Sequence, residues 1–283
     1  MDGLLSNGKL SNNRLAIDFS GNGGSGGSTA WDLNKFEGSY DVSTQSSNTK
    51  SVFFKSDGTS MYVVDVTSDF VYQYTLSTPW DVSTASYASK SFSVSTQEAS
   101  PYDLFFKSDG SKMYIVGLIG ATIYQYTLST PWDVSTASYD SKSLSVSSQD
   151  TNPRGVFIDA SGTKVYIAGN INDTVFQYTL STPWDISTGT YASKSFSVAT
   201  QDVAPHGLFF KPDGSKMYIL GENTDFIYQY TLGTLFDVST ATYNDTRFDI
   251  SEQDSTGSGL FFKPDGLNFF IAGQNNYIYQ YKV

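Results

Sequence analysis

The segment GLFFKPDGSKMYILG, residues 207–221, decides the fold because the chain repeats it with few changes. Related segments start at Val52 (VFFKSDGTSMYVV), Leu104 (LFFKSDGSKMYIV), Val156 (VFIDASGTKVYIA) and Leu260 (LFFKPDGLNFFIA), so the repeat spacing is 52 residues. A fixed period of about this size is typical of solenoids and propellers, whose units cannot bury their apolar faces alone. The chain is therefore a repeat protein.

Each unit contains four runs with the composition of β-strands. The runs HGLFFK, KMYILG, FIYQYTL and YASKSFSV are rich in aromatic and β-branched residues, and Gly, Asp, Asn, Ser and Pro separate them. LFF and MYIL carry apolar residues on both faces, which predicts that both faces of each sheet are covered. YASKSFSV alternates, as an outermost strand would. Four antiparallel strands per unit favour a propeller.

The two ends of the chain complement each other. Residues 31–45, WDLNKFEGSYDVSTQ, match the later PWDVSTASYASKSFSVSTQ and supply a fourth strand without the three that precede it. The last unit stops at NYIYQYKV, a third strand without a fourth. Pairing the N-terminal strand with the C-terminal strand removes two exposed sheet edges. The sequence therefore predicts an all-β, five-bladed propeller over residues 30–283, closed by the N-terminal strand on the C-terminal blade. Residues 1–29 are interpreted as an N-terminal extended arm and Gly/Ser linker.

The third unit, NPRGVFIDASGTKVYIAGNINDTVFQYTL (152–180), resembles the repeats of NHL-type and YVTN-type propellers. It shares their P-x-G before the inner strand, their D-x-x-G turn, their Y-[VI] second strand and their N-x-x strand opening. The inserted S-T-P-W-D-[VI]-S-T segment departs from those families. Repeats with this insertion are similar to ones found in phage and marine bacterial structural proteins. The resemblance implies the fold and leaves the activity open.

Composition excludes several classes of partner. The net charge of −11 argues against nucleic acid and against an anionic membrane surface, since both need clustered Lys and Arg. Cysteine is absent, so neither a thiolate nucleophile nor a Cys-based zinc site is expected. The first residues lack a basic region followed by a continuous apolar stretch, so a Sec-type leader is not expected.

Positions that recur in every unit are interpreted first as blade construction. An Asp–Gly pair follows the first strand in four units, a hairpin turn in which Asp bonds its own backbone. Gln recurs in the third strand, as expected for a buried bridge between blades. An acid follows Gln at the exit of the fourth strand, where a turn cap is favoured over a calcium ligand. The three sets are Asp57, Asp109, Asp213 and Asp265; Gln73, Gln125, Gln177, Gln229 and Gln280; and Glu98, Asp150, Asp202 and Asp254.

The tryptophans Trp80, Trp132 and Trp184 recur in P-W-D, with Trp31 in A-W-D and Phe236 in the degenerate copy. We favour a hydrophobic plug between blades, because an indole is usually mostly buried. The alternative is a set of aromatic platforms that stack on sugar rings.

The variable positions carry the functional expectation. In a propeller, the loop entering the innermost strand and the loop joining strands two and three lie together around the central channel. The first loop presents Lys50, Tyr102, Arg154, His206 and Ser258 at equivalent places; the second reads VTSD, LIGA, NIND, ENTD and QNN, and includes Asp225. Rigid scaffolds usually carry recognition on such loops, although drift in unconstrained loops would also vary them. These residues are the expected ligand-binding set.

No catalytic residue, metal site or cofactor is expected. His206 is the only histidine, so neither a His-based metal triad nor a Ser–His relay is expected within one chain. Asp65, Glu222 and Asp225 are scattered acids without a matched pattern, so a metal-dependent hydrolase or lactonase is a minority hypothesis.

The leading hypothesis is a non-enzymatic component of a phage virion, in the capsid or tail. Residues 1–28 would anchor it to particle proteins or to neighbouring copies, and its loops would face outward toward a host surface glycan or a protein. The alternative is a secreted, extracellular carbohydrate-binding lectin or adhesin of a marine bacterium.

Overall fold

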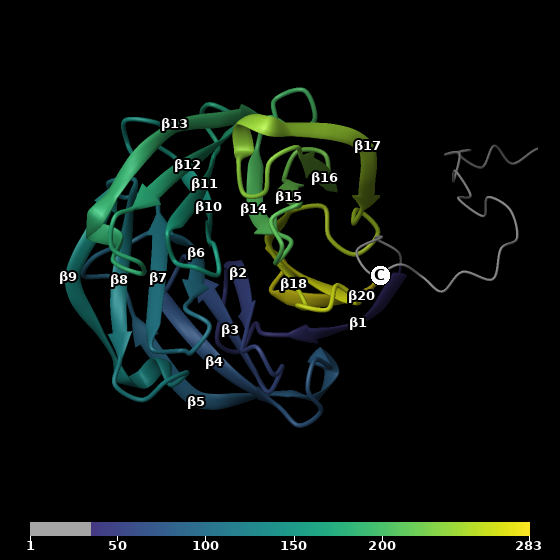
Figure 1. The fold of residues 1–283 in the computed structure, drawn as a ribbon. Coiled ribbons are helices and arrows are strands. Elements are labelled where there is room, and N and C mark those ends of the chain that lie inside the picture. The colour runs from purple at the N-terminus through teal and green to yellow at the C-terminus, as the bar shows by residue number, and fades with distance from the viewer. Residues whose placement is uncertain (1–34) are drawn as a thin grey trace, which may run out of the picture.

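The computed structural model describes residues 35–283 and shows a ring of sheets around a central axis (Figure 1). In the described part, five sheets each contain four antiparallel strands. This confirms the predicted all-β, five-bladed propeller. The expected boundary at residue 30, the arm of residues 1–29 and Trp31 lie outside the described residues.

Each blade runs from the axis to the rim. The innermost strands are β2 (Thr49–Phe54), β6 (Pro101–Phe106), β10 (Pro153–Ile158), β14 (Pro205–Phe210) and β18 (Gly257–Phe262). The second strands are β3 (Ser60–Asp65), β7 (Lys112–Gly117), β11 (Lys164–Gly169), β15 (Lys216–Gly221) and β19 (Asn268–Gly273). The third strands are β4 (Phe70–Leu76), β8 (Thr122–Leu128), β12 (Thr174–Leu180), β16 (Phe226–Leu232) and β20 (Tyr277–Lys282).

The outermost strands and four short 3-10 helices complete the ring. The outermost strands are β1 (Lys35–Asp41), β5 (Ala85–Ser93), β9 (Ala137–Ser145), β13 (Gly189–Ser197) and β17 (Ala241–Asp249). The helices are η1 (Val82–Thr84), η2 (Val134–Thr136), η3 (Ile186–Thr188) and η4 (Val238–Thr240). Strand β15 is buried along nearly its whole length, whereas β13 alternates between half-buried and exposed residues. The burial follows the sequence pattern, because only the outermost strand has one wet face.

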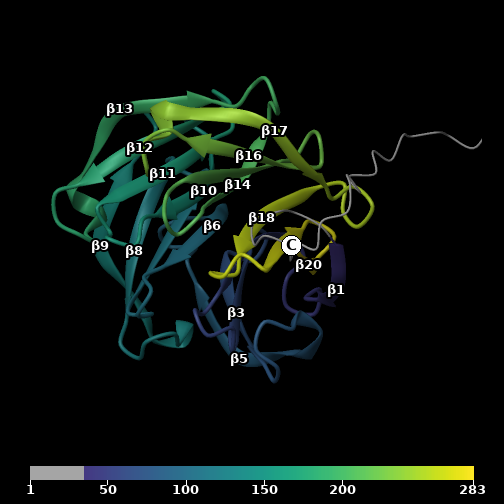
Figure 2. The same cartoon turned by 45° about the vertical axis from the view of Figure 1, so that its right-hand side comes forward.

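The ring closes where its two ends pair. Strand β1 joins β20 in antiparallel register, with Phe36 opposite Tyr281 and Tyr40 opposite Ile278. Both views of the ribbon place β1 beside β20 (Figure 2). Across the seam, the Val82 amide donates to Gln280 Oε1 over 3.0 Å. The predicted closure by the N-terminal strand is confirmed.

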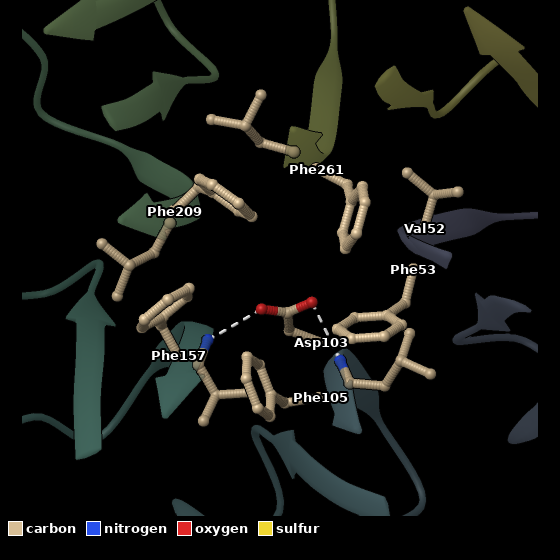
Figure 3. A pocket seen from close by; sticks show the side chains of 11 residues that line it. Val52, Phe53, Asp103, Phe105, Phe157, Phe209 and Phe261 are labelled. Carbon is tan, nitrogen blue, oxygen red and sulfur yellow. Dashed lines mark hydrogen bonds between the residues drawn. The ribbon is translucent and has the colours of Figure 1, made fainter. Parts of the chain in front are cut away.

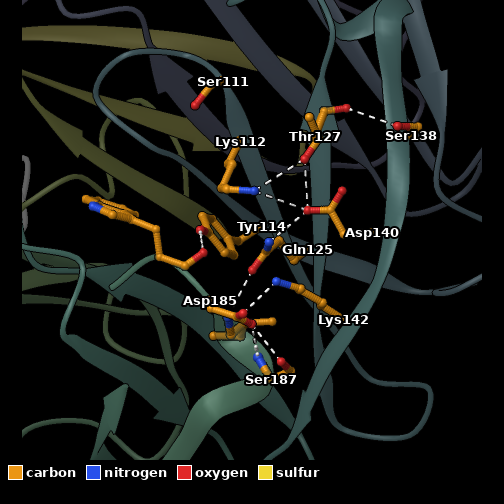
Figure 4. A network of polar contacts seen from close by, with 12 residues as sticks. Ser111, Lys112, Tyr114, Gln125, Thr127, Ser138, Asp140, Lys142, Asp185 and Ser187 are labelled. Carbon is orange, nitrogen blue, oxygen red and sulfur yellow. Dashed lines mark hydrogen bonds and ion pairs between the residues drawn. The ribbon is translucent and has the colours of Figure 1, made fainter. Parts of the chain in front are cut away.

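The recurring glutamines bridge neighbouring blades, as the sequence indicated. Gln125 is fully buried, and its Oε1 accepts the Ile186 amide of the next blade at 2.9 Å. Its Nε2 donates to Asp140 at 2.7 Å, within a network that also contains Lys112 and Thr127 (Figure 4). At three of the seams, the Asp that directly follows Trp132, Trp184 or Phe236 adds an ion pair. The pairs are Lys90 with Asp133, Lys142 with Asp185 and Lys194 with Asp237.

The P-W-D aromatics cover the Asp–Gly turns on the face where strands one and two are joined. A Cβ added to Gly110 would lie 2.4 Å from the indole of Trp132, so the ring lies directly on the glycine. The Tyr62 hydroxyl of the preceding blade donates to the Trp132 carbonyl at 2.7 Å. The same packing recurs at Gly58 with Trp80, Gly162 with Trp184 and Gly214 with Phe236. These contacts are those expected of a plug between blades.

The Asp–Gly turns have the predicted local chemistry. Asp57 accepts the Thr59 amide at 3.0 Å and pairs with Lys55 at 2.8 Å. In the third blade, where Ser161 replaces this Asp, Asp159 accepts the amides of the turn instead. No helix among residues 35–283 is both long and apolar enough to cross a bilayer.

Candidate functional site: the channel mouth

The central channel is closed by a ring of five phenylalanines. Each innermost strand contributes one ring, and neighbours meet mostly edge to face. The members are Phe53, Phe105, Phe157, Phe209 and Phe261, and successive centroids around the axis are 5.5, 5.3, 5.5, 5.7 and 4.9 Å apart. Figure 3 shows these rings around a small cavity. Its volume is about 20 Å³, so the space between the rings holds about one water molecule.

Asp103 also lines this cavity. Its Oδ2 accepts the Val156 amide of the next blade at 2.7 Å, and its Oδ1 accepts the Leu104 amide at 2.9 Å and the hydroxyl of Ser51. Gly155 occupies the equivalent place one blade on, where a Cβ would lie 2.5 Å from the His206 carbonyl oxygen. Burial raises the pKa of Asp103 to about 7. This carboxyl ties three innermost strands together beside the phenylalanine ring.

The loops at the open end are held rigidly. In each of four blades, the loop after strand two donates an amide to the loop that enters strand one; Glu222 N to Ala204 O, at 3.0 Å, is one case. The acid at the exit of the preceding fourth strand caps both loops. Asp202 is 2% exposed and accepts the Ala204 amide at 2.6 Å and the Thr224 amide at 3.0 Å. The turn-cap interpretation of these acids is confirmed.

The first blade makes the same cap from the opposite side. Ser46 stands where the other blades have the acid, and Asp65 stands where they have glycine. Asp65 is 1% exposed and accepts the Ser47 amide at 3.0 Å and the Thr67 amide at 2.8 Å. In the second blade, a Cβ at Gly117 would lie 2.5 Å from the Glu98 side chain. Only one of the two positions can therefore carry the carboxylate, and blade 1 has exchanged them.

Tyr102 is the centre of the mouth. The Arg154 guanidinium carbon lies 3.9 Å from the centre of its ring, and Lys50 Nζ lies 5.3 Å from it. The imidazole of His206 meets the same ring edge to face at 6.0 Å. Four blades thus bring four of the predicted residues into one contact group. The expectation that these loops converge on the channel is confirmed.

His206 and Glu222 form a second contact in the mouth. His206 is 1% exposed, and its Nε2 lies 2.9 Å from Glu222 Oε2. Glu222 Oε1 accepts Gln274 Nε2 of the next blade at 2.6 Å. The hydrogen bond from His206 lowers the pKa of Glu222 to about 2, and burial lowers the pKa of His206. We assign a neutral imidazole that donates Nε2–H to an ionised carboxylate.

Lys50 is buried although it carries a charge. It is 5% exposed, and burial lowers its pKa to about 8, with the repulsion of Arg154 acting in the same direction. Glu222 and Asp65 oppose this shift. The charged form of Lys50 is therefore disfavoured by its burial and by the nearby Arg154.

Ser258 and Asp225 are not part of the contact group around Tyr102, and both take part in contacts of the backbone. The Ser258 hydroxyl is buried and donates to the carbonyls of Thr49 and Ala272, each at 3.2 Å. Asp225 adopts φ +58° in its turn, and its carbonyl accepts the Ile250 amide at 2.9 Å. Its counterparts Asp69, Ala121, Asp173 and Asn276 share this left-handed conformation. The sequence grouped both residues with the ligand-binding set, but the structure uses them to join segments of the backbone.

Two mouth residues lie in the second loop that the sequence indicated but were not placed in the expected ligand-binding set. Glu222 and Gln274 occupy one repeat position, the first residue after strand two, where the other blades have Val66, Leu118 and Asn170. The sequence could have identified them, because this repeat position varies between blades as widely as the first-loop position that was predicted to bind the ligand. Among residues 35–283, no group of three or more His, Cys, Asp or Glu is placed to hold a metal ion.

Trp80, Trp132 and Trp184 lie half-buried beside the Asp–Gly turns, at the opposite end of the blades from the mouth loops. Lys263 Nζ lies 5.7 Å from the centre of the Trp80 ring, and Lys107 Nζ lies 6.0 Å from that of Trp184. Any stacking of sugar on these indoles would be separate from the mouth.

Comparison with known proteins identifies no family. No family model matches the chain, and no curated protein matches it. Among solved structures it is similar to two proteins provisionally named 6-phosphogluconolactonases, from Bacteroides uniformis (11% identity) and Bacteroides fragilis (15% identity). In each case the alignment covers 71% of this chain and 55% of that chain, with a TM-score of 0.48. A protein of unknown function from Desulfotomaculum acetoxidans is 12% identical, with 80% of this chain and 62% of that chain covered and a TM-score of 0.48.

Proposed function

We propose that this chain is a non-enzymatic recognition module whose ligand binds at the channel mouth. The observation that carries the proposal is the contact group around Tyr102. Different side chains, placed by repeats of one scaffold, meet around one ring on loops that are capped by buried acids. Rigid, chemically varied loops on a repeated frame are the usual arrangement of a binding site.

The arrangement favours binding over catalysis. The hydroxyl of Ser258 is bonded to backbone carbonyls, and that of Ser51 is bonded to Asp103, so neither is oriented as a nucleophile by His206. His206 and Glu222 form a pair, but among the described residues no hydroxyl is hydrogen-bonded to His206 as the nucleophile of a catalytic triad would be. A hydrolase or lactonase remains the competing proposal. A panel of lactones and phosphoesters, tested with added divalent metals, would support it by metal-dependent turnover that is lost in Glu222→Gln.

We place the module on the surface of a virion, with residues 1–28 as its anchor, and keep a secreted lectin or adhesin as the alternative setting. The propeller's Ser/Thr-rich, acidic composition and its similarity to repeats of phage and marine bacterial structural proteins motivate the proposal. In both settings the mouth contacts a surface glycan or a protein.

A glycan array and particle fractionation test the two parts of the proposal. The full chain should bind a subset of surface glycans, and Tyr102→Ala should abolish that binding while its unfolding curve stays unchanged. The virion setting requires the protein to purify with intact particles, and a chain lacking residues 1–28 to stay folded but leave them. Free protein in the medium, with none on particles, would favour the secreted lectin.

A further inference from the structure

The mouth contains two cations without an anionic partner. Eight other lysines among residues 35–283 form ion pairs with aspartates. Lys50 and Arg154 have no ion pair in the described part of the chain, although the protein carries a net charge of −11. The Arg154 side chain is hydrogen-bonded only through Nε, to Asn152 Oδ1 at 2.6 Å. Its terminal nitrogens therefore remain available as a fork of donors.

Glu222 acts on these cations through space but forms no ion pair with either of them among the described residues. Both Glu222 oxygens are occupied, one by His206 and the other by Gln274. Lys50 and Arg154 both lie against the ring of Tyr102, and the charge of Arg154 helps to lower the pKa of Lys50. A negative group placed between them would remove that repulsion and satisfy donors that the fold leaves unused.

A buried acceptor lies beside the cations. Neither ring nitrogen of His206 makes a hydrogen bond of good geometry among residues 35–283, although Nε2 lies 2.9 Å from Glu222 Oε2, and the side chain is almost completely buried. With the imidazole proton on Nε2, facing the Glu222 carboxylate, Nδ1 is left as an acceptor. A ligand hydroxyl is the simplest group that would satisfy it. Buried polar atoms without partners are uncommon in folded proteins, and a missing ligand is one explanation of them.

We propose, as a deepening of the recognition function above, that the mouth binds an oxyanion substituent of a hydroxylated ligand, such as an acidic sugar. Lys50 and the terminal nitrogens of Arg154 bind the carboxylate or sulfate, and His206 Nδ1 accepts a neighbouring hydroxyl. Tyr102 supplies the surface on which both cations rest. Asp103 and the phenylalanine ring beneath prevent the anion from descending further, so only its charged end enters.

Calorimetry with matched sugars tests this proposal on the full chain. Glucuronate, glucose 6-sulfate and glucose differ only in the substituent. We expect at least one acidic sugar to bind more than about 10-fold tighter than glucose, because a charged hydrogen bond contributes more than a neutral one. Binding of both would show that any oxyanion suffices, and binding of one would identify the source as carboxylate or sulfate.

Charge-removing variants locate the site. Lys50→Met and Arg154→Leu should each weaken binding of the acidic sugar by about 10-fold or more. Lys90→Met removes a lysine that is paired with Asp133 at a seam between blades, and should leave the affinity unchanged. Unfolding curves of all three variants show whether any loss is due to folding.

The outcomes separate this inference from the wider function. Glucose binding as tightly as both acids, with loss of binding in Tyr102→Ala only, would overturn the anion proposal and leave the recognition site intact. Failure of both acidic sugars to bind at about 10 mM would also overturn it. In that case the glycan array still decides whether the mouth recognises anything.

Discussion

The loop cap at the mouth gives a matched comparison of one carboxylate in two environments. Asp202 lies in the loop that enters the fourth blade and Asp213 lies in a turn of that blade, and each accepts hydrogen bonds from the backbone beside it. Asp202 is 2% exposed and serves the amides of Ala204 and Thr224. The Asp213 side chain is 51% exposed and accepts the Ser215 amide at 2.9 Å. The two Asp→Ala substitutions should therefore differ mainly through burial.

The expected loss follows from what each deletion leaves behind. In Asp202→Ala, two amides of capped loops lose their acceptor, and an unsatisfied buried donor costs about 1–3 kcal/mol, so the free energy of unfolding should fall by about 2–5 kcal/mol. In Asp213→Ala the turn amide returns to water and an exposed ion pair is lost, which costs about 1 kcal/mol or less.

Urea denaturation followed by tyrosine and tryptophan fluorescence measures both losses, provided that the m-value is unchanged. Asp202→Asn, which keeps one acceptor oxygen, should fall between the two variants. Equal losses in Asp202→Ala and Asp213→Ala would refute the reasoning, because they would show that burial does not set the strength of the cap. Asp202→Ala should also weaken ligand binding, since the loop that it caps carries Glu222.

Three further predictions concern other parts of the molecule. Gly110 has φ +73° beneath Trp132, so Gly110→Ala should lower the free energy of unfolding by about 2 kcal/mol or more. Gly38 has open space around it, so Gly38→Ala should change that free energy by under about 1 kcal/mol. Similar values for the two variants in urea titrations would contradict the packing of the indole on Gly110. Burial raises the pKa of Asp103 from 3.8 to about 7, so stability should fall as pH rises from about 4 to about 7 and then level off. The difference between wild type and Asp103→Asn across about pH 4–8 should show that slope, and a parallel pair of curves would argue against it. Burial lowers the pKa of Lys50 to about 8, so this side chain should lose its charge above that pH. The affinity of the wild type for an acidic sugar should therefore decline at alkaline pH, while the affinity of Lys50→Met should not change with pH. An unchanged wild-type affinity up to pH 10 would count against a role for the ammonium group.

The fold could be predicted from the sequence because the 52-residue blade unit is repeated five times. The spacing of the LFFK segments, the alternating YASKSFSV run and the unmatched ends together determine the blade number and the closure. The repeated Gln and acid positions were interpretable for the same reason, since one hydrogen-bonding role had to suit several blades. Repetition separates structural residues from variable ones.

The site could be predicted only in part, because its contacts join different blades. The sequence placed Lys50, Tyr102, Arg154 and His206 on one face, but not the ring on which the cations rest. It also could not distinguish a side chain that enters the mouth from one that bonds the backbone, as Ser258 does. The partner of His206 is Glu222, in another loop, and only the three-dimensional proximity of the loops identifies it.

The pairing of β1 with β20 has a consequence for biogenesis. Glu37 and Gln280 are hydrogen-bonded yet 243 residues apart, so at ribosomal speeds of about 5–20 residues per second the first partner waits roughly 10–50 s for the second. During translation β1 has no partner strand until β20 is made, whereas each intervening blade is built from four consecutive strands and is complete earlier. We therefore expect the final, slow step of maturation to be the docking of this early segment, and chaperone dependence or misassembly between nascent chains to concentrate there.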